Sequence, residues 1–166
     1  MINDSEEEKI KKDIIYLKGD ATTPNIQGIK IIVHICNDIG AWGKGFVLAV
    51  SKRWSEPEKE YKKWYKDGTN FKLGEVQFIQ VSEDKYVANM IGQRDIRRGK
   101  SGVPIRYEAV NKCLEKVCEK ALELGATVHM PRIGCGLAGG KWEEIEKLID
   151  KNICSKSIDV YVYDIE

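Results

Sequence analysis

Short apolar runs alternate along the chain with stretches of helical periodicity. Runs at residues 14–17, 31–35, 76–81, 86–91, 127–130 and 158–163 are rich in β-branched or aromatic residues and are bounded by glycine or polar residues. Such runs are typical of strands. Residues 31–35 are almost continuously apolar, which predicts a strand buried on both faces. The polar segment 82–84 predicts a turn, so the third and fourth strands form a hairpin or lie next to each other.

Between these runs, apolar residues recur at helical spacing. A first helix is predicted from Phe46 to Trp54, and a second one follows a capping box formed by Ser55 and Glu58. The strongest helical pattern begins near Pro104 and stops at Gly125. Its apolar face is Val110, Cys113, Leu114, Val117, Cys118, Ala121 and Leu122. The last helix carries Trp142, Ile145, Leu148 and Ile149.

Strands and helices therefore alternate, which predicts an α/β fold with a largely parallel sheet covered on both faces. Residues 1–12 are charged and lack apolar periodicity, so we expect a solvated tail. Residues 13–166 have the length of one domain, and no repeat or linker divides them.

Composition narrows the classes of partner. The 166 residues contain 27 Lys and Arg against 26 Asp and Glu, a net charge of +1, so neither duplex DNA nor an anionic membrane is attracted by bulk charge. The five cysteines are scattered without a Cys-x-x-Cys pair, and there are two histidines. This pattern favours reduced thiols in a cytoplasmic protein and predicts no metal site. We also expect no signal peptide or membrane anchor.

Two glycine-containing loops join predicted strands to predicted helices. Gly134, Gly136 and Gly139 form one, and Gly40, Gly43 and Gly45 lie in the other. A Rossmann domain places such a loop in its first βαβ unit, and a Walker A loop needs Ser or Thr where Trp142 stands, so both are excluded. In an α/β sheet both loops reach the carboxyl edge of the strands, where their amides can hold a diphosphate. A purely structural turn remains the alternative for the first loop.

Three segments resemble the ligand-binding segments of macrodomains. They are residues 19–22 (Gly-Asp-Ala-Thr), residues 34–37 (His-Ile-Cys-Asn) leading to Gly43-Lys44-Gly45, and residues 131–140 (Pro-Arg-Ile-Gly-Cys-Gly-Leu-Ala-Gly-Gly). The resemblance runs over residues 13–165. It is nearest to the branch that contains ADP-ribose-1''-phosphate phosphatases and terminal ADP-ribose protein glycohydrolases. It implies a three-layer α/β/α fold with a mostly parallel, mixed central sheet, and it implies binding of ADP-ribose.

The same resemblance assigns roles to individual residues. It implies that Asp20 contacts adenine, with Ile165 bordering the adenosine half, and that Asn37 and Gly43 to Phe46 surround the distal ribose. Ala21 and Trp42 are also expected among the ligand-binding residues. The residues expected to hold the diphosphate are Gly134, Cys135, Gly136, Leu137, Ala138 and Gly139. Arg132 and Ile133 are also expected to bind the ligand, Arg132 by pairing with a terminal phosphate. The branch's glycohydrolases use a lysine and an aspartate for which this chain has Gly92 or Gln93 and Ala138. A route through a lysine adduct therefore lacks the amine at that position. Lys44 is a nearby alternative amine, and the other interpretation of Lys44 is a solvated or phosphate-neutralising charge.

The remaining candidates for catalysis are His34, Asn37 and Gln93. A histidine at its ordinary pKa of about 6.5 is suited to acid–base chemistry, whereas the two amides can only orient water or ribose. The alternative for His34 is a buried strand histidine. We expect a monomer without cofactor or metal that binds ADP-ribose or an ADP-ribosylated small molecule or protein, and no sequence-specific nucleic acid. Three functions stay open: an ADP-ribose-1''-phosphate phosphatase (preferred), a non-catalytic reader of ADP-ribosylated protein, and a glycohydrolase or deacylase with another residue set.

Overall fold

The computed structural model describes residues 10–97 and 102–165. Most of the expected tail at residues 1–12 lies outside this part of the chain. The strands are β1 Ile15–Lys18, β2 Lys30–Asn37, β3 Val76–Ser82, β4 Lys85–Gln93, β5 Thr127–Met130 and β6 Val160–Asp164. The helices are α2 Phe46–Arg53, α3 Glu56–Asp67, α4 Tyr107–Leu124, α5 Trp142–Asn152 and the short 3₁₀ helix η1 Cys154–Lys156.

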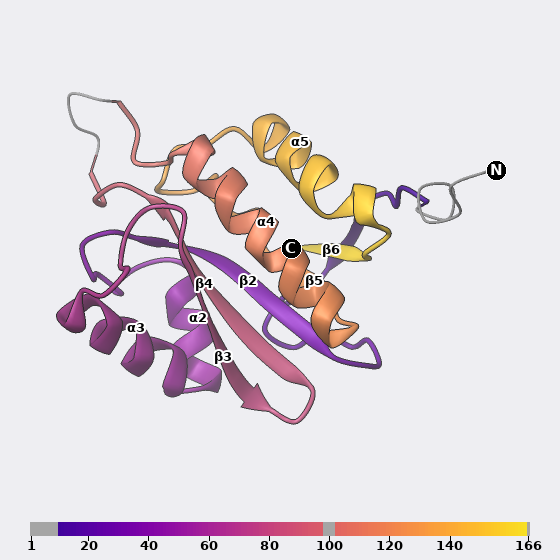
Figure 1. Cartoon of the computed structure of the whole chain (residues 1–166), viewed down its shortest axis with the longest axis horizontal. Coiled ribbons are helices and arrows are strands. Elements are labelled where there is room, and N and C mark those ends of the chain that lie inside the picture. Colours follow the sequence, from indigo (N-terminus) through magenta and orange to yellow (C-terminus); the bar gives the residue numbers. More distant parts are fainter. Residues whose placement is uncertain (1–9, 98–101, 166) are drawn as a thin grey trace.

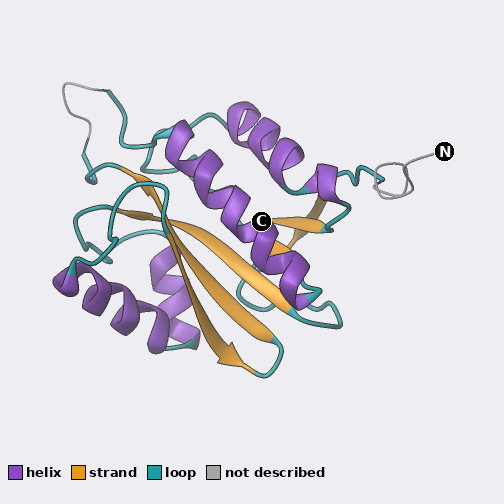
Figure 2. Ribbon diagram, viewed as in Figure 1, coloured by secondary structure: helices purple, strands orange, loops and turns teal. Residues whose placement is uncertain are grey.

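The strands form one sheet in the order β1-β6-β5-β2-β4-β3 (Figure 1). All neighbours are parallel except β3 and β4, which form an antiparallel hairpin. Helices α2 and α3 cover one face and α4 and α5 cover the other (Figure 2). The structure thus confirms the predicted three-layer α/β/α fold with a mixed, mostly parallel sheet.

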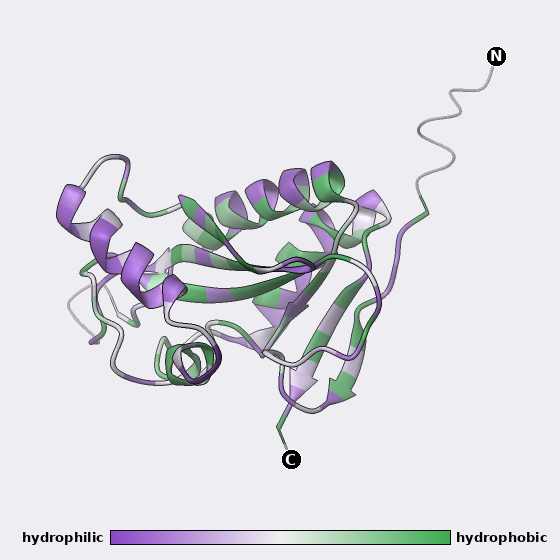
Figure 3. Cartoon of the chain, turned by 90° about the horizontal axis from the view of Figure 1, so that it is seen from below, coloured by the Kyte–Doolittle hydropathy of each residue, from purple (hydrophilic) through white to green (hydrophobic). Residues whose placement is uncertain are grey.

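Strand β2 lies at the centre because both of its faces are apolar. Ile31 and Val33 belong to the core under α4 and α5, whereas Ile32 and Cys36 belong to the core over α2 and α3. Successive side chains of a strand point to opposite faces, so one strand supplies both cores. The apolar strands at the middle of Figure 3 show this burial between the two helical layers. None of the helices in the described ranges is long and apolar enough to cross a membrane.

Helix α4 buries the predicted apolar stripe, including both of its cysteines, except for Leu122, which is 58% exposed because it lies at the edge of the buried face. The helix ends at Gly125 in the left-handed conformation (φ 65°). Its start differs from the prediction. Pro104 lies in a bend before the helix, and Ile105 makes an antiparallel bridge to Gln93 of β4. The helix therefore begins at Tyr107 rather than near Pro104.

The predicted capping box before α3 is not formed. Ser55 has helical dihedral angles and makes no side-chain capping bond, because the chain turns almost directly from α2 into α3. The carboxylate of Glu58 instead accepts hydrogen bonds from Ser51 (3.0 Å) and Lys62 (2.6 Å). Glu58 consequently joins the two helices rather than closing the first turn of α3.

Candidate functional site

The loops after β2 and β5 meet at one cavity of about 240 Å³ at the carboxyl edge of the sheet. Parallel strands end on the same side, which brings these loops together (Figure 2). The cavity is lined by His34, Ile35, Lys44, Gly45, Phe46, Val47, Gln93, Pro131, Arg132, Ile133, Gly134, Gly136, Leu137 and Ala138.

Both loops bring backbone amides to the residues that line this cavity. Gly45 (φ 83°) precedes α2, so the amides of Phe46 and Val47 are first-turn donors that have no partner within the helix. In the other loop, Gly139 donates to the Gly136 carbonyl (3.0 Å) and Gly140 to the Gly134 carbonyl (2.7 Å). Within the described residues, the amides of 135–138 donate to no protein oxygen. Two sets of free donors therefore border one cavity, which suits an anion.

The charged side chains of the lining are basic. Lys44 and Arg132 border the cavity, and among the described residues no Asp or Glu does. Arg132 forms a bidentate ion pair with Asp164 (2.6 and 2.9 Å), and its guanidinium group lies over the rings of Tyr16 and Trp142. This ion pair lowers the pKa of Asp164. Arg132 is therefore held in place by its ion pair. Among the described residues Lys44 has no ion-pair partner, so its side chain is free to move toward a ligand.

His34 lies on β2 with its ring buried between Trp42 and Phe46, whose centroids are 5.4 and 5.8 Å away. Its Nε2 is 2.6 Å from Oδ1 of Asn89. Its Nδ1 is buried and has no protein partner. Burial lowers the pKa of His34 to about 4, the Asn89 bond opposing only part of this shift. The imidazole is therefore neutral at neutral pH and borders the cavity as a hydrogen-bond acceptor or weak base.

Gln93 enters the cavity because of a β-bulge. The register of β2 and β4 shifts between Cys36 and Asn37, so that Asn37 pairs with Gln93. A side chain at Gly92 would instead meet Val110 of α4 at 3.0 Å. Of the two positions that the sequence left open, Gln93 is thus the one at the cavity. Its Nε2 donates to the carbonyl of Asp95 (2.8 Å).

Asn37 does not appear in the cavity lining, and its side chain holds the following turn. Its Oδ1 accepts from the amides of Ile39 (3.1 Å) and Ala41 (3.0 Å), and its Nδ2 donates to the Ala41 carbonyl (2.7 Å). The hydroxyl of buried Tyr61 is 2.6 Å from the Asn37 carbonyl oxygen. These contacts position the loop that leads to Lys44.

Removing the Tyr61 hydroxyl tests this support. We expect Tyr61→Phe to lower the free energy of unfolding by about 1–2 kcal/mol, because the Asn37 carbonyl would lose a buried donor. Urea unfolding followed by tryptophan fluorescence measures the change. Tyr65→Phe is the control, since Tyr65 is on the same helix and 45% exposed. Equal stability of both variants and the wild type would contradict the role of Tyr61.

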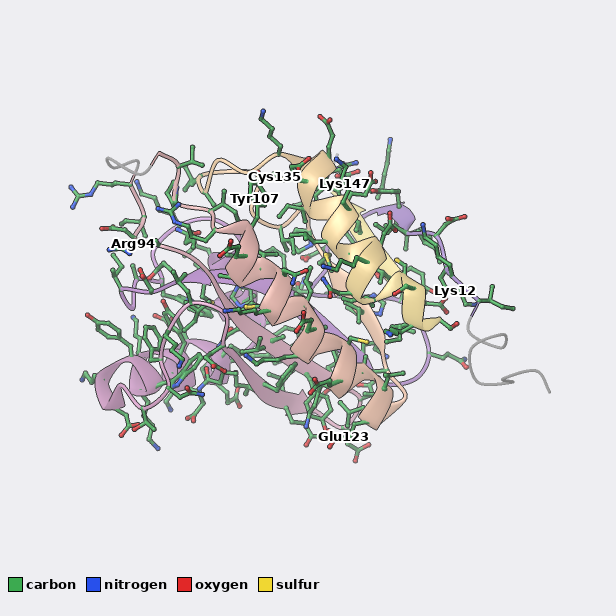
Figure 4. The ribbon with its side chains drawn as sticks, turned by 45° about the horizontal axis from the view of Figure 1, so that its top comes forward. Lys12, Arg94, Tyr107, Glu123, Cys135 and Lys147 are labelled. Atoms are coloured by element: carbon green, nitrogen blue, oxygen red, sulfur yellow. The ribbon has the colours of Figure 1, made fainter. Side chains whose placement is uncertain are left out.

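The other predicted residues do not belong to the lining of this cavity. Asp20 accepts from the amide and hydroxyl of Thr22 (2.8 and 2.7 Å) and is 3.7 Å from Arg53. Trp42 is buried and donates to Ser51 (2.7 Å). Cys135 packs toward the core under α5, where burial raises the pKa of its thiol; Figure 4 labels it in the loop before α5. Ala21, Gly43, Gly139 and exposed Ile165 are likewise outside the lining.

Three lining residues had no role in the sequence interpretation, namely Ile35, Val47 and Pro131, although Ile35 and Pro131 lie within the segments that resemble ligand-binding segments. Each one directly follows or precedes a predicted site residue, so adjacency was the available signal. Asn89 was also missed, because it lies 55 positions from His34 in sequence and meets it only through the pairing of β2 with β4.

Known proteins with a similar sequence share this fold. The family model described as Macro domain matches residues 33–149. A solved structure of a protein of unknown function from Bacteroides thetaiotaomicron is 56% identical, with a TM-score of 0.91 over 92% of this chain and 98% of that one. A macrodomain protein from Streptomyces coelicolor is 49% identical, with a TM-score of 0.83 over 93% of this chain and 100% of that one.

Among curated relatives, the chromodomain-helicase-DNA-binding protein 1-like of Danio rerio is 34% identical over 90% of this chain. The match spans 15% of that much longer protein. The ADP-ribose 1''-phosphate phosphatase of Lodderomyces elongisporus is 25% identical, over 90% of this chain and 98% of that one.

Proposed function

The chain belongs to the macrodomain family, and on that premise we propose that it binds ADP-ribose and hydrolyses ADP-ribose derivatives, with ADP-ribose 1''-phosphate as the preferred substrate. The observation that supports binding most strongly is the meeting of two amide-rich loops at one cavity. A full-length relative carries the name of this phosphatase.

In the proposed complex the diphosphate lies between the first turn of α2 and the 133–138 loop. The free amides there supply neutral donors, and Lys44 supplies a positive charge. Asp20 and Ile165 follow β1 and β6 at the same edge of the sheet, and we assign the adenosine half to that side. The distal ribose then reaches the end of the cavity bordered by His34 and Gln93.

Hydrolysis of the phosphate ester requires water to attack phosphorus while the ester bond to the sugar oxygen breaks, giving ADP-ribose and inorganic phosphate. Lys44 is the positively charged residue that we assign to the phosphate oxygens on which charge develops, whereas Arg132 is held by Asp164 on the side assigned to adenosine. The Oε1 of Gln93 is the side-chain acceptor that we assign to the attacking water. Asn37 acts at a distance from the substrate by holding the Lys44 loop.

A side-by-side panel tests this function. ADP-ribose binding is measured by calorimetry, and turnover is measured on ADP-ribose 1''-phosphate, O-acetyl-ADP-ribose, glutamyl-ADP-ribosylated protein and ADP-ribosylated DNA. We expect heat on ADP-ribose addition and phosphate release above a buffer blank. A flat titration would remove the proposed function altogether.

A reader of ADP-ribosylated protein is the second candidate, favoured by one observation. Among the described residues the cavity lining contains no carboxylate, and the pKa of His34 is about 4, so strong acid–base groups are scarce. Binding of ADP-ribose without turnover of any substrate in the panel would select this function over hydrolysis.

Removing the charge of Lys44 tests whether it contacts the diphosphate of the ligand. We expect Lys44→Gln to weaken ADP-ribose binding about threefold to tenfold and to reduce its dependence on salt, because one cationic contact to the diphosphate is lost. Calorimetry at two salt concentrations measures both effects. Lys52→Gln, at the far end of α2, is the matched control; equal losses in the two variants would contradict a specific contact of Lys44.

A further inference from the structure

The two ring nitrogens of His34 have different surroundings. Nε2 faces Asn89 Oδ1 at 2.6 Å, whereas Nδ1 is buried without a partner in a residue that borders the cavity. The whole residue is 1% exposed. A buried polar atom without a protein partner is uncommon, and the residue that carries this one borders the cavity.

Which nitrogen carries the proton follows from the orientation of Asn89. The Nδ2 of Asn89 donates to the Pro57 carbonyl (3.1 Å) and to Oε1 of Gln77 (3.0 Å). A carbonyl only accepts, so the amide nitrogen must lie on this side and the oxygen must face His34. The His34 nitrogen that faces this oxygen must then be a donor, which places the proton on Nε2.

Gln77 fixes the outer end of the same chain of hydrogen bonds. Its Nε2 donates to the carbonyl of Glu60 on α3 (2.9 Å), so its Oε1 is turned toward Asn89. Two amide side chains thus connect the backbone of α3 to His34. Each amide has a single orientation that satisfies all of its partners, and the result is a lone pair on Nδ1.

We propose that Nδ1 of His34 is a preformed acceptor for a hydroxyl group of the distal sugar, and that Asn89 and Gln77 are positioning residues that hold it in that state. The inference rests on the proposed binding of ADP-ribose. A neutral nitrogen with a lone pair attracts an O–H donor and repels the lone pairs of phosphate oxygens. The inner end of the cavity therefore selects a sugar hydroxyl, whereas the diphosphate is held by the amides of the two loops.

Nitrogen-15 NMR of the two histidines tests the protonation state directly. In the free protein at pH 7 we expect His34 to be protonated on Nε2 and unprotonated on Nδ1. On addition of ADP-ribose the Nδ1 resonance of His34 should move. His129 is an internal reference, because both of its nitrogens have protein partners, Thr127 at 2.7 Å and Tyr163 at 2.8 Å.

Binding measurements test the energetic role. We expect His34→Phe to weaken ADP-ribose binding about threefold to tenfold, the loss of about one neutral hydrogen bond. His34→Asn, which places an amide oxygen near the position of Nδ1, should recover part of the affinity. For at least one analogue that lacks a hydroxyl on the distal ribose, the wild type should lose affinity while His34→Phe loses no more, because the two changes remove the same contact.

Asn89→Leu tests the positioning residue. We expect both tautomers of His34 in its NMR spectrum and a similar threefold to tenfold loss of ADP-ribose affinity. Gln80→Leu is the matched control, since Gln80 is an exposed residue of β3, and it should change neither measurement. The wild-type NMR and the His34 variants test the proposal even where Asn89→Leu does not fold.

The outcomes separate the two proposals. A wild type that binds ADP-ribose with an unmoved Nδ1 resonance, or with additive effects of His34→Phe and every deoxy analogue, would overturn the hydroxyl subsite and leave ADP-ribose binding in place. A proton found on Nδ1 of the free protein would also overturn the subsite. A flat titration of the wild type would remove both proposals.

Discussion

Acidification from pH 7 to pH 4 is expected to cost the folded protein several kcal/mol of stability, enough to unfold a domain of ordinary stability. Burial lowers the pKa of His34 to about 4, and burial together with nearby Lys30 lowers that of His129 to about 3. Both histidines titrate near pH 6.5 once the chain is unfolded. Between about pH 6.5 and 4 the unfolded state therefore binds more protons than the folded state, and stability falls as the pH falls.

The slope of the free energy of unfolding against pH is proportional to the number of protons that the chain takes up on unfolding. Each proton contributes about 1.4 kcal/mol per pH unit, so two histidines give up to about 3 kcal/mol per unit near pH 5. Urea unfolding at half-unit pH steps measures the slope. Carboxylates with lowered pKa values, such as Asp164 and Glu58, lose their stabilising effect mainly below pH 4, outside this window.

His129→Gln separates the histidines from other acid effects. The variant loses the hydrogen bonds to Thr127 and Tyr163, which lowers its stability at pH 7. The slope of its unfolding free energy against pH should be about half that of the wild type. His34→Phe should halve the slope in the same way. Slopes equal to that of the wild type in both variants would show that the acid sensitivity comes from groups other than these two histidines.

The fold was largely predictable because the central strands carry an unambiguous pattern. Strand β2 is apolar on both faces and could only be central, and the alternation of strands and helices implied parallel neighbours. The errors arose where a local signal competed with tertiary contacts. Pro104 is a favourable residue for a helix start, yet the bridge from Ile105 to Gln93 delays the start of the helix to Tyr107. Serine is a favourable residue type for a helix N-cap, yet Ser55 has helical dihedral angles and makes no capping bond.

The meeting of the two glycine loops was also predictable, since parallel strands share their carboxyl edge. The direction of individual side chains was not. The bulge that turns Gln93 to the cavity and Gly92 to α4 depends on a one-residue shift in register. The acceptor state of His34 depends on Asn89 and Gln77, which reach it through strand pairing and not through any motif.

Gly140→Ala is expected to abolish measurable ADP-ribose binding and to lower the free energy of unfolding by about 2–3 kcal/mol. A Cβ at this position would lie 2.5 Å from the carbonyl oxygen of Gly134. That same oxygen accepts the 2.7 Å hydrogen bond from the Gly140 amide, so the backbone cannot separate without opening the loop. Because the obstacle is backbone rather than a flexible side chain, the strain must be relieved by moving residues 134–140.

Gly136→Ala separates the loss of stability in Gly140→Ala from the loss of a glycine as such. Its added Cβ has nothing within 4 Å, and Gly136 is not in the left-handed conformation, so its thermal midpoint should match that of the wild type. Calorimetry with ADP-ribose and thermal unfolding are measured on both variants. If Gly140→Ala binds ADP-ribose as the wild type does, the loop geometry that ties Gly134 to Gly140 is not what presents the free amides to the diphosphate, and the anion must be held by the α2 side of the cavity alone.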